Sequence, residues 1–276
     1  MKREIISFMV LMFTMLPAKA QLTVMSYNIK YANEDDGRNS WSLRKDHLAG
    51  QLKFYEPNIF GVQEALHSQL EFLKDELSGY EYFGKGRDDG DQKGEFSAIF
   101  FKTNKFELLK DGTFWLSTTP EKPGKGWDAD YPRVCTYGLL KEKETGKEFW
   151  VFNTHFDHKG EAARAESVKL IHRRIKEINQ EERPMILMGD LNLEPETGEI
   201  EFLTTHYKDS KNEAEVVFGP EGTFNGYDFF SPVTRRIDYI FTSGEIDVKK
   251  YGVLSDSKDL KYPSDHLPVL VQLELP

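Results

Sequence analysis

The sequence predicts one domain of mixed α and β structure. Short runs rich in Val, Ile, Phe and Tyr recur along the chain, and segments with helical spacing of apolar residues lie between some of them. The 276 residues contain no internal repeat, no low-complexity tract and no linker rich in Pro, Gly or Ser. Because strands and helices mix without strict alternation, the pattern is typical of packed sheets with helices on the outside.

The first twenty residues have the pattern of a signal peptide. Lys2-Arg3 precedes an apolar run from Ile5 to Leu16, and Ala18-Lys19-Ala20 has the form of a cleavage site. The run is shorter than the roughly 20 apolar residues that cross a bilayer, so a retained anchor is the less favoured alternative. We expect residues 1–20 to be removed, residues 21–276 to form the domain, and the protein to be exported to the periplasm or the medium without stable membrane insertion.

Eight strands and three helices can be placed in order. The expected strands are Leu22–Ile29, Ile59–Val62, Ala98–Phe101, Thr136–Leu140, Phe149–Thr154, Met185–Met188, Ile237–Phe241 and Val269–Leu273. The expected helices are Leu43–Tyr55 with Ser42 as its N-cap, Ser68–Leu77, and Gly160–Asn179 with Val168, Ile171, Ile175 and Ile178 at helical spacing. The loops 33–39, 87–95 and 118–133 are rich in Gly, Asp, Lys and Pro and are expected on the surface.

The composition limits the possible partners. The chain has 36 Lys and Arg against 46 Asp and Glu, a net charge of −10. This balance argues against broad, sequence-blind attraction to nucleic-acid backbones, although it allows a local positive cleft. Cys135 is the only cysteine, so the fold has no internal disulfide, and we expect this thiol to be a small buried residue rather than a nucleophile.

Polar residues that could take part in catalysis or metal binding follow apolar β runs. Asn28, Glu64, His155 and Asp190 each stand at or directly after the end of such a run. This repeated position would bring several strand ends to one rim and build a site there. Each residue alone also has a structural explanation: a turn for Asn28, a helix start for Glu64, a half-buried structural ring for His155 and an Asx turn for Asp190.

The polar motifs together resemble a known family. Tyr27-Asn28, Val62-Gln63-Glu64, Gly189-Asp190-Leu191-Asn192, Arg236-Ile237-Asp238-Tyr239 and Ser264-Asp265-His266-Leu267-Pro268-Val269 occur in the order seen in the endonuclease/exonuclease/phosphatase superfamily, the deoxyribonuclease-I-like metal-dependent phosphoesterases. This resemblance implies a four-layer α/β sandwich, with two packed mixed β-sheets flanked by helices. The stretches 222–227 and 263–268 look closest to the deadenylase-like 3′-exoribonuclease branch, here as a secreted bacterial type.

The resemblance also implies roles for individual residues. Asn28 and Glu64, assisted by Asp265, would bind Mg²⁺, with Mn²⁺ as a second choice, since both ions accept oxygen ligands. Asp190 would deprotonate the attacking water, Asn192 would hold that water or a phosphate oxygen, Asp238 would orient His266, and His155 would contact the scissile phosphate. Weaker candidates for phosphate contacts are Arg44, Arg87, Arg133 and His158.

These assignments predict a metal-dependent hydrolase that acts on a phosphoester substrate by in-line attack of water. The first expectation is a phosphodiesterase or nuclease of exonuclease type, and the alternative is a phosphatase acting on phosphorylated sugars, nucleotides or lipid head groups. A third, non-enzymatic alternative is a binding module on the same fold. The motifs of serine hydrolases, zinc proteases and P-loop enzymes do not occur. We expect a monomer.

Overall fold

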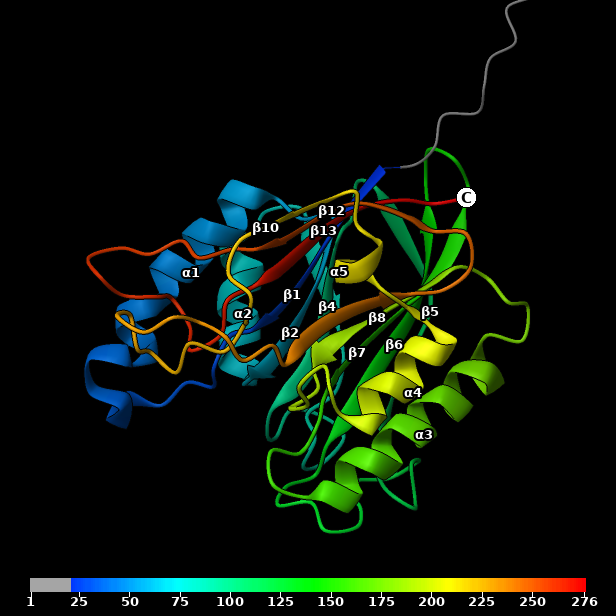
Figure 1. The fold of residues 1–276 in the computed structure, drawn as a ribbon, viewed down its shortest axis with the longest axis horizontal. Helices are drawn as coiled ribbons and strands as arrows, with labels where there is room; N and C mark the ends of the chain where they lie inside the picture. Colours follow the sequence, from blue (N-terminus) through cyan, green and yellow to red (C-terminus); the bar gives the residue numbers. More distant parts are fainter. Residues whose placement is uncertain (1–20) are drawn as a thin grey trace, which may run out of the picture.

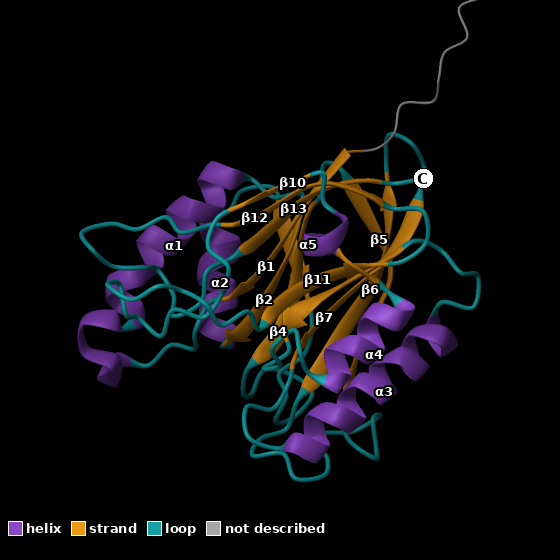
Figure 2. Ribbon diagram, viewed as in Figure 1, coloured by secondary structure: helices purple, strands orange, loops and turns teal. Residues whose placement is uncertain are grey.

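The computed structural model describes residues 21–276, which form two packed β-sheets enclosed by helices (Figure 1). Helices cover the outer face of each sheet, and the strands of the two sheets lie between them (Figure 2). This arrangement confirms the predicted four-layer sandwich. The predicted signal peptide lies outside the described residues. Within residues 21–276, no helix is both long enough and apolar enough to cross a membrane.

The first sheet has the strand order β10-β12-β13-β1-β2-β4-β3. Its members are β1 (Gln21–Asn28), β2 (Ile59–Ala65), β3 (Tyr80–Phe83), β4 (Phe96–Lys102), β10 (Val216–Phe218), β12 (Asp247–Val253) and β13 (Val269–Glu274). Strand β1 runs parallel to β2 and antiparallel to β13. The carboxyl ends of β1 and β2 therefore lie at the same edge as the start of β13.

The second sheet has the order β5-β6-β7-β8-β11-β9. Its members are β5 (Phe106–Trp115), β6 (Val134–Glu142), β7 (Glu148–His155), β8 (Met185–Asp190), β9 (Lys208–Asp209) and β11 (Asp238–Thr242). Strand β7 is parallel to β8, and β11 is antiparallel to β8 with Asp238 directly opposite Asp190. The ends of β7 and β8 thus meet the start of β11.

Helices cover the two outer faces. The first sheet is covered by α1 (Trp41–Tyr55) and α2 (His67–Glu76), and the second by α3 (Glu161–Ile178) and α4 (Gly198–His206). Two shorter helices, η1 (Glu34–Asn39) and α5 (Ser210–Glu213), lie in connections. One apolar cluster fills the space between the sheets, and one more lies beneath each helical layer. Cys135 is fully buried, as predicted.

All eight predicted strands and all three predicted helices are present, with shifted ends. Helix α1 starts at Trp41 after Ser40, two residues earlier than predicted. The sequence analysis missed β3, β5, β9, β10, β12, α4 and α5. Strand β5 was missed because it lies at a sheet edge, where exposed Glu107 and Lys110 interrupt the apolar pattern.

Two expectations about loops are wrong. The segment 33–39 contains the helix η1, with the Asn33 side chain accepting from the Asp35 N–H at its start. The segments 87–95 and 118–133 do not lie wholly on the surface, since Arg87 and Arg133 are buried. Buried arginines need hydrogen-bond partners, so both loops are held against the domain.

A buried polar network joins the two sheets behind their common edge. The Gln63 amide nitrogen on β2 donates to Asn153 Oδ1 on β7 at 2.7 Å, and Asn153 donates in turn to Val62 O and Ala98 O. Gly61 leaves the space for this contact, because a Cβ there would lie 2.7 Å from Asn153 Cγ. These three hydrogen bonds cross from β7 to β2 and β4, so the strand ends of the two sheets are held in register, although Gln63 Oε1 has no partner among the described residues.

Candidate active site

The structure brings the strand-end residues of both sheets into one cluster. Asn28 ends β1, Glu64 lies near the end of β2, His155 ends β7 and Asp190 ends β8. Asp238 opens β11, while Asp265 and His266 lie in the connection that leads into β13. All seven are less than half exposed, and all but Glu64 are buried.

The backbone is strained at this edge. Glu64, Asn192 and Lys30 have positive φ angles of 61°, 50° and 54°. Such conformations cost of order 1–3 kcal/mol for residues other than glycine and concentrate at functional sites. Gly189, just before Asp190, has φ 152°, and a Cβ there would lie 2.0 Å from Thr154 O. The glycine is therefore required for the close pairing of β8 with β7.

Asp190 lies at the centre of the cluster. Its Oδ2 accepts a hydrogen bond from Asn28 Nδ2 at 3.0 Å and lies 3.4 Å from His155 Nε2 and 3.7 Å from His266 Nε2. Its Oδ1 accepts from the Asn192 N–H at 2.9 Å. Burial and the nearby Asp238 carboxylate raise the pKa of Asp190 to about 7. A carboxylate with this pKa is suited to accept a proton near neutral pH.

His266 is held between carboxylates. Its Nδ1 lies 2.9 Å from Asp238 Oδ2. Burial alone would lower the pKa of His266, but Asp238 and Asp190 together raise it to about 10. The ring is therefore an imidazolium at neutral pH and donates from both nitrogens.

Asp190, Asp238 and His266 could also bind a metal ion, because one ligand atom of each lies within 4.8 Å of the others. The Oδ1 atom of Asp238 is buried and has no hydrogen-bond partner among residues 21–276. Binding through His266 would require the ring to give up a proton that two carboxylates stabilise. The arrangement favours hydrogen-bond and proton chemistry at these three residues.

Glu64 and Asp265 form a second acidic pair, and a cation already lies between them. The Lys30 ammonium is 3.5 Å from Glu64 Oε2 and 3.8 Å from Asp265 Oδ2. Burial opposes the charge on Lys30, but the two carboxylates raise its pKa. Two hard oxygen donors that attract a cation fit a divalent metal ion, so the residues present agree with the predicted metal site.

The Asn28 side chain joins the two carboxylates Glu64 and Asp190. Its Oδ1 accepts from the Lys30 backbone N–H at 3.0 Å, while its Nδ2 donates to Glu64 at 3.1 Å and to Asp190 at 3.0 Å. In this structure the amide turns its nitrogen toward the two carboxylates and so orients both of them. The metal-ligand role predicted for Asn28 stays a prediction.

The opposite side of the cluster is basic. Arg133, 5% exposed, has its Nη1 at 2.9 Å from His155 Nδ1 and its Nη2 at 3.3 Å from His158 Nδ1. Its Nε lies 3.4 Å from Asp157 Oδ2. Burial, Arg133 and Arg87 hold the pKa of His155 well below its usual value. His155 is therefore a neutral ring at neutral pH.

Arg87 belongs to the same basic side. Its Nη1 donates to Glu95 Oε2 at 2.6 Å, and its guanidinium lies 5.0 Å from the centre of the Tyr131 ring. Tyr131 stacks in turn on His158, with ring centres 6.2 Å apart. The loops 87–95 and 118–133 thus meet at the edge of the cluster.

Arg44 is not a phosphate contact in this structure. Its guanidinium donates to the carbonyl oxygens of Ile29, Lys30, Asn39 and Pro263 at 2.5 to 3.2 Å. The Nε, Nη1 and Nη2 atoms of Arg44 therefore all donate to acceptors within the protein. Arg44 instead ties the end of β1 to the segment that carries Asp265 and His266.

The segment 222–227 contacts both members of the Asp238–His266 pair. Thr223 Oγ1 accepts from the N–H groups of Ile237 and Asp238, each at 3.1 Å. The Phe224 ring packs edge-on against His266, with centres 5.1 Å apart. These contacts place the segment 222–227 against the start of β11 and against the His266 ring.

Sequence reasoning missed Lys30 and Glu95. Lys30 lies two residues beyond Asn28, but a basic residue beside expected metal ligands gave no signal. Glu95 stands before a β run rather than after one, so the position rule that found the other residues did not apply to it.

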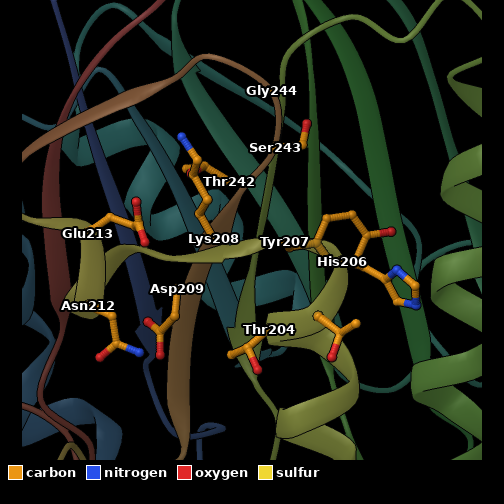
Figure 3. Close-up of a pocket in the computed structure, with 11 residues that line it drawn as sticks. Thr204, His206, Tyr207, Lys208, Asp209, Asn212, Glu213, Thr242, Ser243 and Gly244 are labelled. Atoms are coloured by element: carbon orange, nitrogen blue, oxygen red, sulfur yellow. The ribbon is translucent and has the colours of Figure 1, made fainter.

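A separate polar cleft lies away from this cluster, at the end of α4 and β11 (Figure 3). Its volume is about 420 Å³, and it is lined by residues from 204 to 213 and from 242 to 244. Asp209 in this cleft is paired with Arg236. The predicted catalytic and metal-binding residues do not line it.

Known proteins resemble the chain over nearly its whole length. Residues 25–266 match the model of the endonuclease/exonuclease/phosphatase family. The structure of a protein of that family from Bacteroides thetaiotaomicron is similar, with 41% identity, a TM-score of 0.91, and coverage of 94% of this chain and 99% of that one. The structure of a mannosyl-6-phosphatase from the same organism is similar with 42% identity, a TM-score of 0.88, and coverage of 91% and 99%.

One of the curated relatives is an exoribonuclease subunit. The chain is 30% identical over 134 residues to the CCR4-Not complex 3′-5′-exoribonuclease subunit Ccr4 of Emericella nidulans. This match covers 42% of this chain and 20% of that protein. The chain covers no more than 59% of the length of the first curated relatives that it matches. These partial matches agree with the predicted likeness to deadenylase-like enzymes.

Proposed function

The chain belongs to the endonuclease/exonuclease/phosphatase family, and we propose that it is a metal-dependent phosphatase that hydrolyses the phosphate monoester of a phosphorylated sugar to the free hydroxyl group and inorganic phosphate. Family members are phosphoester hydrolases, and the site has the groups such a reaction needs. The observation that carries the proposal is the position of Asp190 between a neutral histidine and a cationic one, His155 at 3.4 Å and His266 at 3.7 Å.

The two histidines and Asp190 divide the chemistry. Asp190, with a pKa of about 7, accepts the proton of the water that attacks phosphorus. His266 donates hydrogen bonds as an imidazolium, and His155 as a neutral ring, to oxygens that gain charge as the P–O bond breaks. Asn192, half-buried beside His155, is placed to hold the water or a phosphate oxygen. A divalent ion held by Glu64 and Asp265 would supply positive charge against the phosphate.

The preference for a monoester and a sugar comes from the comparisons and the charge. The sequence alone favoured a diesterase or nuclease. A mannosyl-6-phosphatase is 42% identical over nearly the full length of both chains, whereas the exoribonuclease matches are 30% identical over 42% of this chain or 23% identical over 91% of it. The net charge of −10 also disfavours a long polyanionic substrate.

A substrate panel tests the proposal. The purified protein, supplied with Mg²⁺, is assayed for phosphate release from mannose 6-phosphate, a mannoside bearing a 6-phosphate and glucose 6-phosphate, and for cleavage of bis-p-nitrophenyl phosphate and single-stranded RNA. We expect the sugar monoesters to give the highest kcat/KM, with kcat lower by about 10³-fold or more in Asp190→Asn. Faster cleavage of the diester or of RNA would reject the phosphatase assignment.

An exonuclease-type phosphodiesterase is the second candidate, because curated relatives are 3′-5′-exoribonucleases. Progressive shortening of the RNA in the same panel would support it. A binding module without catalysis is disfavoured, because it needs neither the raised pKa of Asp190 nor the imidazolium of His266.

We further propose that the metal is Mg²⁺ or Mn²⁺, that the protein is exported to the periplasm or the medium, and that it is a monomer. The oxygen-only donor pair Glu64 and Asp265 supports the choice of metal, and the sequence of residues 1–20 supports export. Activity after metal exchange tests the choice of metal. The N-terminal residue of protein recovered from cell fractions tests export, and light scattering tests the monomer. A chain starting at Met1 in the cytoplasm would reject export.

A further inference from the structure

We propose that Arg133 fixes the tautomers of His155 and His158, so that each ring is neutral and carries its proton on Nε2. Arg133 lies just before β6 and points its guanidinium at the Nδ1 atoms of both rings, 2.9 Å from His155 and 3.3 Å from His158. A guanidinium has five N–H donors and no acceptor. A ring nitrogen that faces it must offer a lone pair, which leaves the single proton of a neutral imidazole on Nε2.

The far side of the His155 ring faces one acceptor and one donor. Its Nε2 lies 3.4 Å from the Asp190 Oδ2 atom, an acceptor toward which an N–H group at Nε2 would point. The Asn192 amide nitrogen donates one N–H group to Phe156 O at 3.1 Å, and its other N–H group, 3.2 Å from Nε2, is neutral and therefore competes for a ring lone pair more weakly than the Arg133 cation at Nδ1. The opposite tautomer would place an N–H group 2.9 Å from a cationic donor, which is the less stable arrangement.

The charges around the two rings also favour the neutral forms. Glu95 Oε2 is 3.9 Å from His155 Nδ1, but Arg87 holds that carboxylate at 2.6 Å. The other charged groups facing His155 are Arg133, Asp190 and the His266 imidazolium. Around His158 lie Arg133, Asp157, Lys159 and Asp130, the last 3.8 Å from Nε2. Burial and Arg133 lower the pKa of both histidines.

Asp157 keeps the guanidinium in place. Its Oδ1 accepts from the N–H groups of Lys159 and Gly160 at 3.0 and 2.8 Å, and its Oδ2 lies 3.4 Å from Arg133 Nε. The carboxylate is therefore fixed by the start of α3, and it fixes Arg133 in turn.

The catalytic consequence rests on the proposed function. A neutral ring held this way presents its single N–H group, at Nε2, toward the phosphate. Unlike an imidazolium, it has no acidic proton to give to a leaving oxygen. His155 then stabilises charge on a phosphate oxygen without transferring a proton. Arg133 is a positioning residue that acts through His155, in place of the direct phosphate contact predicted from the sequence.

Nuclear magnetic resonance tests the proposal without any substrate. Two-bond ¹H–¹⁵N spectra of the ¹⁵N-histidine-labelled protein distinguish the two tautomers and the cation, and the chain has seven histidines to resolve. Spectra of His155→Gln and His158→Gln assign the two signals. We expect both rings to be neutral with the proton on Nε2 at pH 7. An Nδ1–H tautomer or an imidazolium at His155 would overturn the proposal, whether or not the enzyme is active.

Variants separate positioning from phosphate binding. In Arg133→Met we expect the His155 signal to change form and kcat to fall about tenfold to a hundredfold, with KM within about twofold. Arg133→Lys keeps one charge and should recover part of kcat. The matched control is Arg164→Met, which removes a half-buried arginine bonded to Asp157 O but touching neither ring.

Two outcomes would reject the role of Arg133. One is a raised KM with unchanged tautomers in Arg133→Met, which would identify a phosphate contact. The other is an unchanged His155 spectrum in both Arg133 variants. If Arg133→Met does not fold, the wild-type spectrum and Arg133→Lys still decide. Absence of turnover on every phosphoester would reject the proposed function alone.

Discussion

The two histidines of the cluster, His155 and His266, lie on either side of Asp190 and have opposite surroundings. His266 Nδ1 faces the Asp238 carboxylate at 2.9 Å, and the ring is a cation with a pKa of about 10. His155 Nδ1 faces the Arg133 guanidinium at 2.9 Å, and the pKa of this ring is well below its usual value. The same side chain is thus set to two protonation states by the residue behind it.

This difference separates the roles within one site. An acidic side, with Glu64, Asp238 and Asp265, stabilises cations, including Lys30 and His266. A basic side, with Arg87 and Arg133, keeps His155 neutral. Asp190 faces both sides, and its proton affinity depends on both. Enzymes commonly assign acid and base roles by pushing neighbouring pKa values apart in this way.

Removing the shared carboxylate should have the largest effect. Asp190→Asn keeps the shape of the side chain but cannot accept the proton of water, so we expect kcat to fall by about 10³-fold or more. Steady-state kinetics on the best substrate of the panel measures this change. Asp111→Asn, on an exposed part of β5, is the control and should retain full activity. A decrease of less than tenfold would mean that Asp190 is not the base.

Replacing Asp238 should make His266 more like His155. In Asp238→Asn the pKa of His266 should fall, because its nearest carboxylate becomes neutral, and kcat should fall by about 10²-fold near pH 8. The wild-type rate should rise with pH as Asp190 loses its proton near about pH 7, and fall as His266 loses its proton near about pH 10. These limbs belong to the coupled pair.

The sign of the shift in Asp238→Asn follows from the active form of His266. Since the protonated ring is required, a lower pKa moves the alkaline limb to lower pH. A pH–rate profile of the variant measures this shift. An alkaline limb that stays where it is in the wild type would show that Asp238 does not control His266.

Glu64→Gln tests the acidic side alone. The change removes one of two anionic oxygen donors, so we expect metal affinity to fall by about tenfold to a hundredfold, measured by calorimetric titration with Mg²⁺ and Mn²⁺. In the wild type, a chelator should remove activity and excess Mg²⁺ should restore it. The tautomer of His155, on the basic side, should not change. Equal metal affinity in the variant and the wild type would move the metal site elsewhere.

Lys30→Met should give the smallest change. The ammonium and a metal ion compete for Glu64 and Asp265, and a partly exposed ion pair is worth about 1 kcal/mol or less. We therefore expect metal affinity to rise by up to roughly fivefold, while the metal-free protein melts at a lower temperature. Weaker metal binding in Lys30→Met would show that the lysine supports the metal rather than competing with it.

Part of the site could be predicted from the sequence because strand ends are local features. Asn28, Glu64, His155 and Asp190 each close an apolar run, and parallel neighbours place such ends at one edge. Lys30 and Glu95 could not be found by the same reasoning, since Lys30 lies two residues beyond the end of β1 and Glu95 precedes β4.

The arginines show where local reasoning ends. Arg44, Arg87 and Arg133 were all candidates for phosphate contacts from residue type alone, Arg44 in a predicted helix and the other two in predicted loops. In the structure Arg44 binds backbone carbonyls, Arg87 binds Glu95, and Arg133 lies against two histidines. Each role depends on which acceptors the fold places around the guanidinium.

The sequence by itself determined the fold class and most strands and helices, and it supplied the residue types of the predicted catalytic set, because apolar periodicity and short motifs are carried by neighbouring residues. The tertiary structure decided the protonation states of His155 and His266 and the orientation of the Asn28 amide. It also decided the contacts of Arg44, Arg87 and Arg133. These properties depend on partners far away in the chain: Asn28 and Asp190 are 162 residues apart, and His266 and Asp238 are 28 apart. Hydrogen-bond direction and charge are set by such contacts only after the two sheets have packed.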